Sequence, residues 1–414
     1  MSLEWHIKSG SRAAPANAAG ASATPGSRVQ LSPAEILSDY RLAFRSRVAS
    51  VSGRREVLTG KAPFGIFGDG KEVAQLAMAK AFRPGDWRSG YYRDQTFMFA
   101  TGMSDLPAFF AQLYTNTDRE TEPASAGRQM VSHFATRTLD DDGHWKPLAE
   151  AMQSAADLSP VAAHMPRSLG LAYASKLYRS DPALRAAAPG FSVSGDEVTF
   201  ATIGNAGTSE GLFWETMNAA GVLQIPLLVS VWDDGYGISV PNEFQTVKGS
   251  ISAALAGFQR EPGTNGFEIR VVKGWDYPAL VRTYAALSEL VRREHVPALI
   301  HVTEMTQPQG HSTSGSHERY KSKERLAFET SGDPIAKMRD WIIGEKISTA
   351  AELDAFEDED RKAVESARVA AWEAYQAPIK GELDRARGLI ERAQQEAPDV
   401  RLADVVAELA DPLE

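Results

Sequence analysis

The centre of the chain alternates strand-like apolar segments with helix-like segments, and this alternation constrains the fold more than any other feature. Residues 198–203, 226–232, 267–272 and 298–302 have the composition of buried strands. Helical spacing of apolar residues runs between them, up to about residue 223 and again over residues 279–293. Strand–helix–strand alternation predicts an α/β fold, a parallel sheet with helices on both faces. Ligands of such sheets bind beyond the carboxyl ends of the strands.

The flanking regions differ from this centre. Residues 33–50, 71–82 and 104–115 show helical spacing, whereas residues 119–165 have the pattern of long loops around short helices. Residues 306–325 are polar and rich in Gly and Ser, which is typical of a functional loop or lid. We expect three parts: a disordered arm at 1–30, rich in Ala, Ser, Gly and Pro, an α/β domain at 31–335, and a helical, charge-dense extension or linker at 336–414.

Composition excludes several classes of protein. The 44 basic and 54 acidic residues give a net charge of −10, which argues against a nucleic-acid binder or a protein held to acidic lipids. No apolar run approaches the roughly 18 residues that a membrane helix needs. The chain has no cysteine, so disulfides, thiolate metal sites and a cysteine nucleophile are excluded. This composition fits a reducing compartment, and we expect a cytoplasmic protein.

A turn of small residues follows the first central strand. The segment from Thr202 to Gly211 reads TIGNAGTSEG. Its small side chains let backbone N–H groups approach a phosphate, and Thr208 is placed to cap the following helix, whose N-terminus adds a partial positive charge. This signal is weak by itself, because many strand–helix turns contain Gly.

The next strand ends in Val231-Trp232-Asp233-Asp234-Gly235-Tyr236, and Asp234 lies 29 residues after Asn205. That spacing equals one helix and one strand, so two neighbouring parallel strands bring two oxygen-bearing side chains to one sheet edge. Mg²⁺ prefers oxygen ligands and shares them readily with a diphosphate. We therefore expect a metal site formed by Asn205, Asp234 and the backbone carbonyl of Tyr236.

Together these segments resemble a known family. The strings GNAGTSEG, VWDDGYGISVP, SGYYRDQ, SAGRQMVSHF and QGHSTSGS resemble the alpha part of thiamine-diphosphate-dependent 2-oxoacid dehydrogenases, over about Arg41 to Pro378. The resemblance implies the thiamine-diphosphate-binding fold. In the family signature the first metal ligand is acidic and the second is an amide; here Asn205 and Asp234 exchange these types, and Ala206 replaces a glycine. Because one carboxylate and one amide remain, we expect the metal to bind.

The resemblance also implies the roles of individual residues. Tyr92 and Arg93 would grip the diphosphate, since a guanidinium donates two aligned hydrogen bonds. Ser159 and Val161 would support the aminopyrimidine side. His311 would act in a loop that orders over the cofactor and helps to transfer the acyl group. The expected cofactor-binding residues are Tyr92, Arg93, Ser159, Val161, Gly204, Asn205, Ala206, Gly207 and His311.

Some positions depart from the family. Trp232 stands where many relatives carry a basic residue, which gives more weight to Arg93. Ala163 and His164 replace the Thr and Gln of a potassium site, so no potassium is expected. The family signature is Gly-Asp-Gly followed about thirty residues later by Asn, and a literal Gly-Asp-Gly occurs at residues 68–70. No acid–amide pair follows it at the needed distance. The nearest polar residues, 93 and 94, are expected not to follow a strand. We interpret this segment as a helix start. His133 and His317 are expected to be structural or solvated.

The resemblance implies oxidative decarboxylation of a 2-oxo acid, with acyl transfer to the lipoyl group of an acyltransferase. A beta subunit, or a fused beta half, would supply the Glu that activates the cofactor, in an α2β2 or fused-dimer assembly, so the isolated chain is expected to be inactive. The HSTS loop favours a branched-chain substrate, 2-oxoisovalerate-like. Alternatives are the alpha subunit of a pyruvate or acetoin dehydrogenase, and a non-catalytic assembly subunit with a decayed site. A nicotinamide dehydrogenase would need G-x-G-x-x-G, which GNAGTSEG lacks. Ser312 and Ser314 correspond to serines that some relatives phosphorylate.

Overall fold

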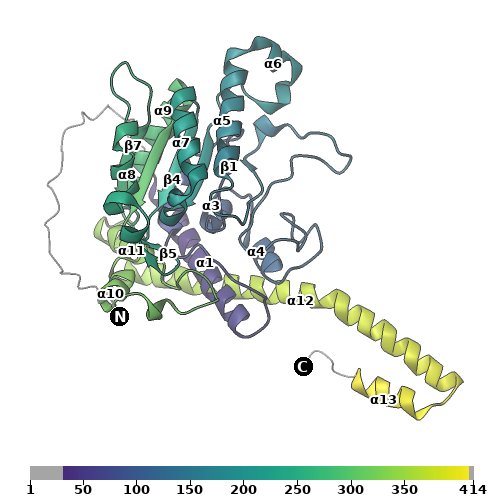
Figure 1. Ribbon diagram of the computed structural model, residues 1–414. Coiled ribbons are helices and arrows are strands. Elements are labelled where there is room, and N and C mark those ends of the chain that lie inside the picture. Colours follow the sequence, from purple (N-terminus) through teal and green to yellow (C-terminus); the bar gives the residue numbers. More distant parts are fainter. Residues whose placement is uncertain (1–30, 410–414) are drawn as a thin grey trace, which may run out of the picture.

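The computed structural model describes residues 31–409, so the arm expected at 1–30 lies outside the described residues. At the centre is a six-stranded sheet in the order β2-β1-β3-β4-β8-β7, in which each neighbouring pair is parallel (Figure 1). The strands are β1 (Trp87–Ser89), β2 (Gln153–Ser154), β3 (Thr199–Gly204), β4 (Leu227–Trp232), β7 (Glu268–Lys273) and β8 (Ala298–Thr303). The α/β fold predicted from the alternation is therefore confirmed.

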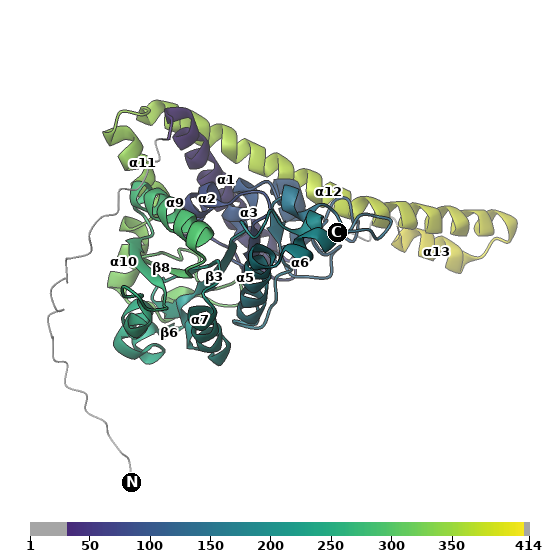
Figure 2. The ribbon, with the colours of Figure 1, turned by 90° about the horizontal axis from the view of Figure 1, so that it is seen from above.

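Two layers of helices cover the sheet, and Figure 2 shows the strands between them. On one face lie α1 (Pro33–Leu58), α2 (Glu72–Ala81) and α9 (Tyr277–Glu294), and their apolar side chains form one core with those of β3, β4 and β8. On the other face, α5 (Met165–Ser180), α7 (Gly211–Leu223) and α8 (Ile251–Ala254) enclose a second core. Both faces of the central strands are thus buried, which explains why these strands are continuously apolar.

The remaining elements connect and flank these layers. They are α3 (Gln95–Ala100), α4 (Leu106–Leu113), α6 (Pro182–Ala187), α10 (Lys323–Ser331), α11 (Pro334–Gly344), and a two-stranded ribbon of β5 (Tyr236–Gly237) and β6 (Val240–Pro241). Local sequence fixes several helix starts: Ser32 and Glu35 form a capping box at α1, and Asp276 caps α9 through the N–H of Ala279. None of the described helices is long and apolar enough to cross a membrane.

The C-terminal part is helical, as expected. Helix α12 (Ala350–Glu396) begins with the capping box of Thr349 and Glu352 and packs against α1 and α4 through buried Val364 and Ala371. Its second half extends away from the α/β body, and α13 (Val400–Glu408) folds back along it (Figure 2). This projecting half has mostly exposed side chains, in agreement with its charge-dense sequence.

Two local predictions were wrong. Thr208 does not cap α7: its hydroxyl donates to the carbonyl of Asn205 at 2.6 Å, because residues 205–209 form a tight 3-10 turn, and α7 begins only after Glu210. The segment at residues 93 and 94 was expected not to follow a strand, but β1 ends at Ser89, just before it. β1 belongs to the same sheet as β3, so the segment does lie at the edge where the cofactor site was expected.

Candidate active site

A cavity of about 570 Å³ lies beyond the carboxyl ends of β3 and β4. The two strands pair in register with Gly204 beside Trp232, so the turns that follow them begin side by side. All but one of the predicted site residues line this cavity, namely Tyr92, Arg93, Val161, Gly204, Asn205, Ala206, Gly207, Asp234, Tyr236 and His311. Ser159 is absent from the lining; its hydroxyl contacts the Nε2 atom of His133 at 3.1 Å.

The turn after β3 is packed closely against the turn after β4. A Cβ atom on Gly237 would lie 2.5 Å from the Cβ of Ala206, so a side chain at 237 would separate the two turns. Asn205 is buried at 3% exposure, and its amide nitrogen donates to Asn242 Oδ1 at 3.5 Å. Since the nitrogen has this partner, the amide oxygen is the atom available to a cation.

Asp234 pairs with a lysine that the sequence analysis did not single out. The Nζ of Lys71 donates to Asp234 Oδ2 at 2.7 Å, while the other carboxylate oxygen accepts from the N–H of Tyr236 at 3.2 Å. Burial alone would raise the pKa of Asp234, but Lys71, together with Arg93, holds it below its usual value. Asp234 is therefore ionised and already carries one cationic partner.

Lys71 belongs to the Gly-Asp-Gly-Lys segment, which was interpreted only as a helix start. Lys71 is indeed the residue before α2, but its side chain crosses to Asp234, 163 positions away in the sequence. One signal could have identified it: a cation at a helix N-terminus opposes the helix dipole, so a lysine there needs a compensating partner.

Arg93 and His311 form a second pair at the cavity wall. Arg93 is 4% exposed; its Nη1 donates to the carbonyl of Phe67 at 2.8 Å, and its Nη2 donates to Nδ1 of His311 at 2.8 Å. Burial, reinforced by the Arg93 charge, lowers the pKa of His311 to about 4. Because a guanidinium can only donate, Nδ1 is the acceptor, and neutral His311 keeps its hydrogen on Nε2. His311 can therefore donate one hydrogen bond from Nε2.

The loop that carries His311 is held by contacts to the N-terminal part of the domain. Thr313 and Gly65 exchange two hydrogen bonds, of 2.9 and 3.0 Å, and Arg54 donates to the carbonyl of Ser312 at 3.0 Å. Gly70 has φ +83°, and its missing Cβ would lie 2.0 Å from the carbonyl oxygen of Thr306. The glycine thus lets this loop approach the segment that carries Lys71.

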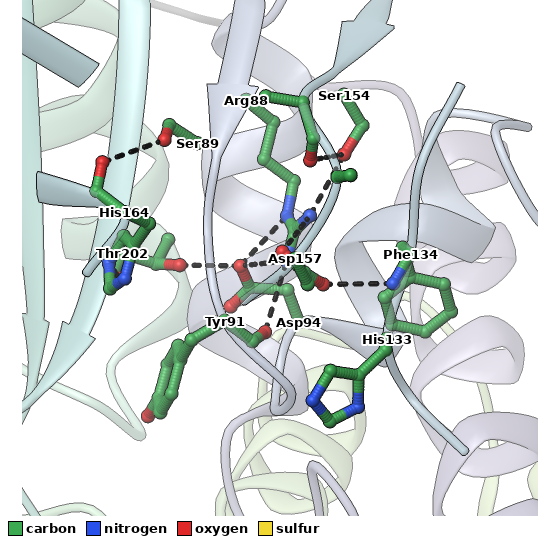
Figure 3. Close-up of polar contacts among 12 residues, drawn as sticks. Arg88, Ser89, Tyr91, Asp94, His133, Phe134, Ser154, Asp157, His164 and Thr202 are labelled. Atoms are coloured by element: carbon green, nitrogen blue, oxygen red, sulfur yellow. Dashed lines mark hydrogen bonds and ion pairs between the residues drawn. The ribbon is translucent and has the colours of Figure 1, made fainter. Parts of the chain in front are cut away.

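A buried ionic network surrounds Arg88 and includes Asp94, the residue that follows Arg93 (Figure 3). Arg88, on β1, donates to Asp94 at 2.9 Å, to Asp157 at 3.0 Å and to the carbonyl of Tyr91 at 3.0 Å, and all three charged side chains are fully buried. The indole N–H of Trp232 also donates to Asp94, at 3.3 Å. The network therefore anchors both ends of the segment that presents Arg93.

His164, which lines the same cavity, is hydrogen-bonded to the sheet edge. Its Nε2 contacts the carbonyl of Thr202 at 2.8 Å, and its backbone carbonyl accepts from the hydroxyl of Ser89 (Figure 3). Burial lowers its pKa to about 4, so the ring is neutral at physiological pH and Nε2 is the donor. His164 therefore joins the sheet edge to the start of α5 as an uncharged side chain.

The comparisons with known proteins agree with this geometry. The model of the family described as dehydrogenase E1 component matches residues 45–380. The chain belongs to the dehydrogenase E1 component family. Members of this family depend on thiamine diphosphate, so the resemblance found in the sequence is confirmed at the level of the family.

Several curated E1 proteins are similar to this chain. The alpha subunit of 2-oxoisovalerate dehydrogenase from Bacillus subtilis is 26% identical over 69% of this chain and 74% of its own length. The mitochondrial mouse protein of that name is 26% identical over 82% of this chain and 70% of its own. The potato pyruvate dehydrogenase E1 alpha subunit is 23% identical, over 84% and 79%.

The lining of the cavity suits thiamine diphosphate in its chemistry. Arg93, His311 and Lys321 offer hydrogen-bond donors, and the lining also includes apolar side chains such as Val161 and Phe244, exposed at 53% and 75%. The cavity offers fewer suitable ligands for a metal ion than for the cofactor. Within residues 31–409 no three His, Asp or Glu side chains are grouped to hold one, and Asp234 is the single carboxylate of the expected set.

Proposed function

We propose that this chain is the alpha part of a 2-oxoacid dehydrogenase, the decarboxylating E1 component, and that it acts on a branched-chain 2-oxo acid. The observation that carries the proposal is one cavity at the ends of β3 and β4 that gathers Asn205, Asp234, Arg93 and His311 from distant segments. The match to the E1 family over residues 45–380 supports the same conclusion.

Thiamine diphosphate, when bound, supplies the carbon nucleophile and the electron sink for decarboxylation. We place its diphosphate against Arg93, Tyr92 and the backbone of the 204–207 turn, where small residues leave N–H groups accessible. Asn205, Asp234 and the carbonyl of Tyr236 are the oxygen donors for a Mg²⁺ ion. They fit this ion in type, but Lys71 already engages one oxygen of the only carboxylate.

The residues of this chain hold and orient the reacting groups. His311, neutral and held through Nδ1 by Arg93, presents its Nε2 hydrogen as a donor. Leu158, Val161 and Ile238 are exposed apolar side chains of the lining, and they would keep water from the reacting end once a beta part covers them. Arg88, through Asp94 and the Tyr91 carbonyl, fixes the loop that positions Arg93.

A partner chain completes the site in this proposal. The apolar rim that includes Val161, Ile238 and Phe244 is exposed in the single chain, and we propose that a beta part covers it and contributes the Glu that activates the aminopyrimidine. The acyl group then passes to the lipoyl arm of an acyltransferase. Without the beta part this chain is expected to have no decarboxylase activity.

The proposed substrate follows from the relatives. Those from Bacillus subtilis and mouse are named for 2-oxoisovalerate, and the potato protein for pyruvate. A branched-chain acid is our first choice, with pyruvate as the second, because the HSTS loop at residues 311–314 carries the branched-chain resemblance.

Calorimetry of thiamine diphosphate with Mg²⁺ tests the cofactor, and decarboxylation of a panel of 2-oxo acids by the chain assembled with a beta chain tests the reaction. We expect binding of the cofactor and a higher kcat/KM for 2-oxoisovalerate than for pyruvate. The reverse order would move the assignment to pyruvate. Failure of the assembled pair to bind the cofactor or to turn over any 2-oxo acid would favour a non-catalytic subunit with a decayed site.

A further inference from the structure

We propose that Lys71 is a built-in cation of the diphosphate site, so that thiamine diphosphate binds this chain with only a weak requirement for a divalent ion. The inference rests on the proposed function, because it takes the diphosphate cofactor as given. In this chain the Lys71 ammonium would supply, next to Asp234, part of the positive charge that a metal ion would otherwise provide.

The contacts of Lys71 match the three hydrogens of an ammonium group. Nζ lies 2.7 Å from Asp234 Oδ2, 2.7 Å from the carbonyl of Thr306 and 3.2 Å from Gln307 Oε1. All three partners are hydrogen-bond acceptors. An ammonium group has three hydrogens to donate to them, whereas a neutral amine has two and would leave one acceptor without a partner.

The surroundings of Lys71 are built around this contact. Lys71 is 1% exposed, and lysines are almost never buried without a paired carboxylate. The two glycines before it make the approach possible: a Cβ on Gly68 would lie 2.3 Å from the Arg93 carbonyl oxygen, and one on Gly70 would lie 2.0 Å from that of Thr306. Lys71 therefore lies between the Arg93 loop and the loop that leads to His311.

Several charged side chains lie near Asp234 and set the charge that a diphosphate group would meet. Lys321 pairs with Glu329 at 2.7 Å, and Arg325 pairs with the same carboxylate at 2.8 Å. Arg93 and Lys321 line the cavity, as do the carboxylates Asp234 and Glu210, whereas Lys71 lies behind Asp234, outside the lining. Because Lys71 offsets the charge of Asp234 and Asn205 is neutral, the charge of Arg93 is left to attract a diphosphate group without a metal ion.

Lys71 also lowers the attraction of the site for a divalent ion. Asp234 is the only charged ligand that the expected metal set contains, and one of its oxygens is engaged by the ammonium. A divalent ion bound at Asp234 would lie close to the Lys71 ammonium and be repelled by it, because the interior of a protein screens like charges only weakly. The metal therefore adds less to diphosphate binding than it would beside an unpaired carboxylate.

Calorimetric titration of the full chain with thiamine diphosphate, in Mg²⁺ and in EDTA, tests the proposal. We expect the Kd in EDTA to exceed the Kd in Mg²⁺ by less than about 10-fold for the wild type. Lys71→Gln, which keeps a donor but removes the charge, should raise this ratio at least about 10-fold above the wild-type ratio. Lys71→Arg, which keeps the charge, should stay near the wild-type ratio.

Lys80→Met is the matched control. Lys80 lies on α2, the helix that Lys71 precedes, and also pairs with an aspartate, Asp39, at 2.9 Å, but Asp39, unlike Asp234, does not line the cavity. Its variant should show the wild-type ratio. The proposal is overturned by a wild-type ratio above about 10, which needs no variant to fold, or by an unchanged ratio in Lys71→Gln. Absence of thiamine diphosphate binding even in Mg²⁺ would instead refute the proposed function, and this inference with it.

Discussion

Replacing Arg88 by Met should destabilise the domain strongly. The guanidinium is fully buried and is the cationic partner of both Asp94 and Asp157, at 2.9 and 3.0 Å, which are fully buried as well (Figure 3). Removing one partner of a buried ion pair leaves an uncompensated charge and costs about 3–5 kcal/mol. Asp94 keeps the indole N–H of Trp232, and Asp157 keeps the N–H of Phe134, so we expect a loss near the lower end, about 3 kcal/mol.

The free energy of unfolding, measured by urea denaturation with tryptophan fluorescence, checks this value. The control is Arg83→Met, because Arg83 pairs with Glu289 at 2.7 Å while both side chains are about half exposed. An exposed pair of this kind contributes about 0–1 kcal/mol. If Arg88→Met costs no more than Arg83→Met, the buried network does not hold β1 and the Arg93 loop in place.

Three further changes have definite expected outcomes. Asp234→Asn removes the charged metal ligand, so the calorimetric Kd for thiamine diphosphate should become nearly the same in Mg²⁺ as in EDTA; a Mg²⁺ effect as large as that of the wild type would show that Asp234 does not bind the metal ion. The native pKa of His164 is about 4, below its unfolded value near 6.5, so the unfolded state binds a proton first and stability falls as pH drops from about 6.5 toward 4. Between pH 7 and 5 the free energy of unfolding falls by about 2 kcal/mol because of His164, and a His164→Gln variant should lack this part of the loss. Gly237→Ala puts a methyl group 2.5 Å from Ala206, and cofactor affinity should fall while the melting temperature changes little; a wild-type affinity would show that the two turns can separate freely.

The central sheet and its helices could be predicted because their sequence signal is local. β3, β4, β7 and β8 are six-residue strands next to long helices with regular apolar spacing. β1 and β2 contain three and two residues, which are too few for a periodic pattern. β1 also includes Arg88, and arginine is a residue type that is normally exposed. Arg88 is tolerated inside because Asp94 and Asp157, which pair with it, come from loops that sequence alone does not bring together.

Part of the candidate site could also be predicted from the sequence, and part could not. Asn205 and Asp234 were predicted to meet because they follow neighbouring strands, and the structure places both at one cavity. Their cofactor and metal roles stay predictions. Lys71 could not be placed there, since nothing in the local pattern shows that a residue before α2 reaches a strand end 163 positions later.

The residues that differ from the family pattern have hydrogen-bond partners in the folded chain. The carboxylate at Asp234 meets the Lys71 ammonium, and the indole of Trp232, in place of a basic side chain, donates to Asp94. His164, where the family resemblance implies a potassium ligand in some relatives, donates to the carbonyl of Thr202. The pairing is not complete, because Nδ1 of His164 and Oε1 of Gln245, both in the cavity lining, are buried without a partner. The exchanges at Asp234 and Trp232 nevertheless have complementary partners, which a rearranged but working diphosphate site requires, and calorimetric binding of the cofactor separates such a site from a decayed one.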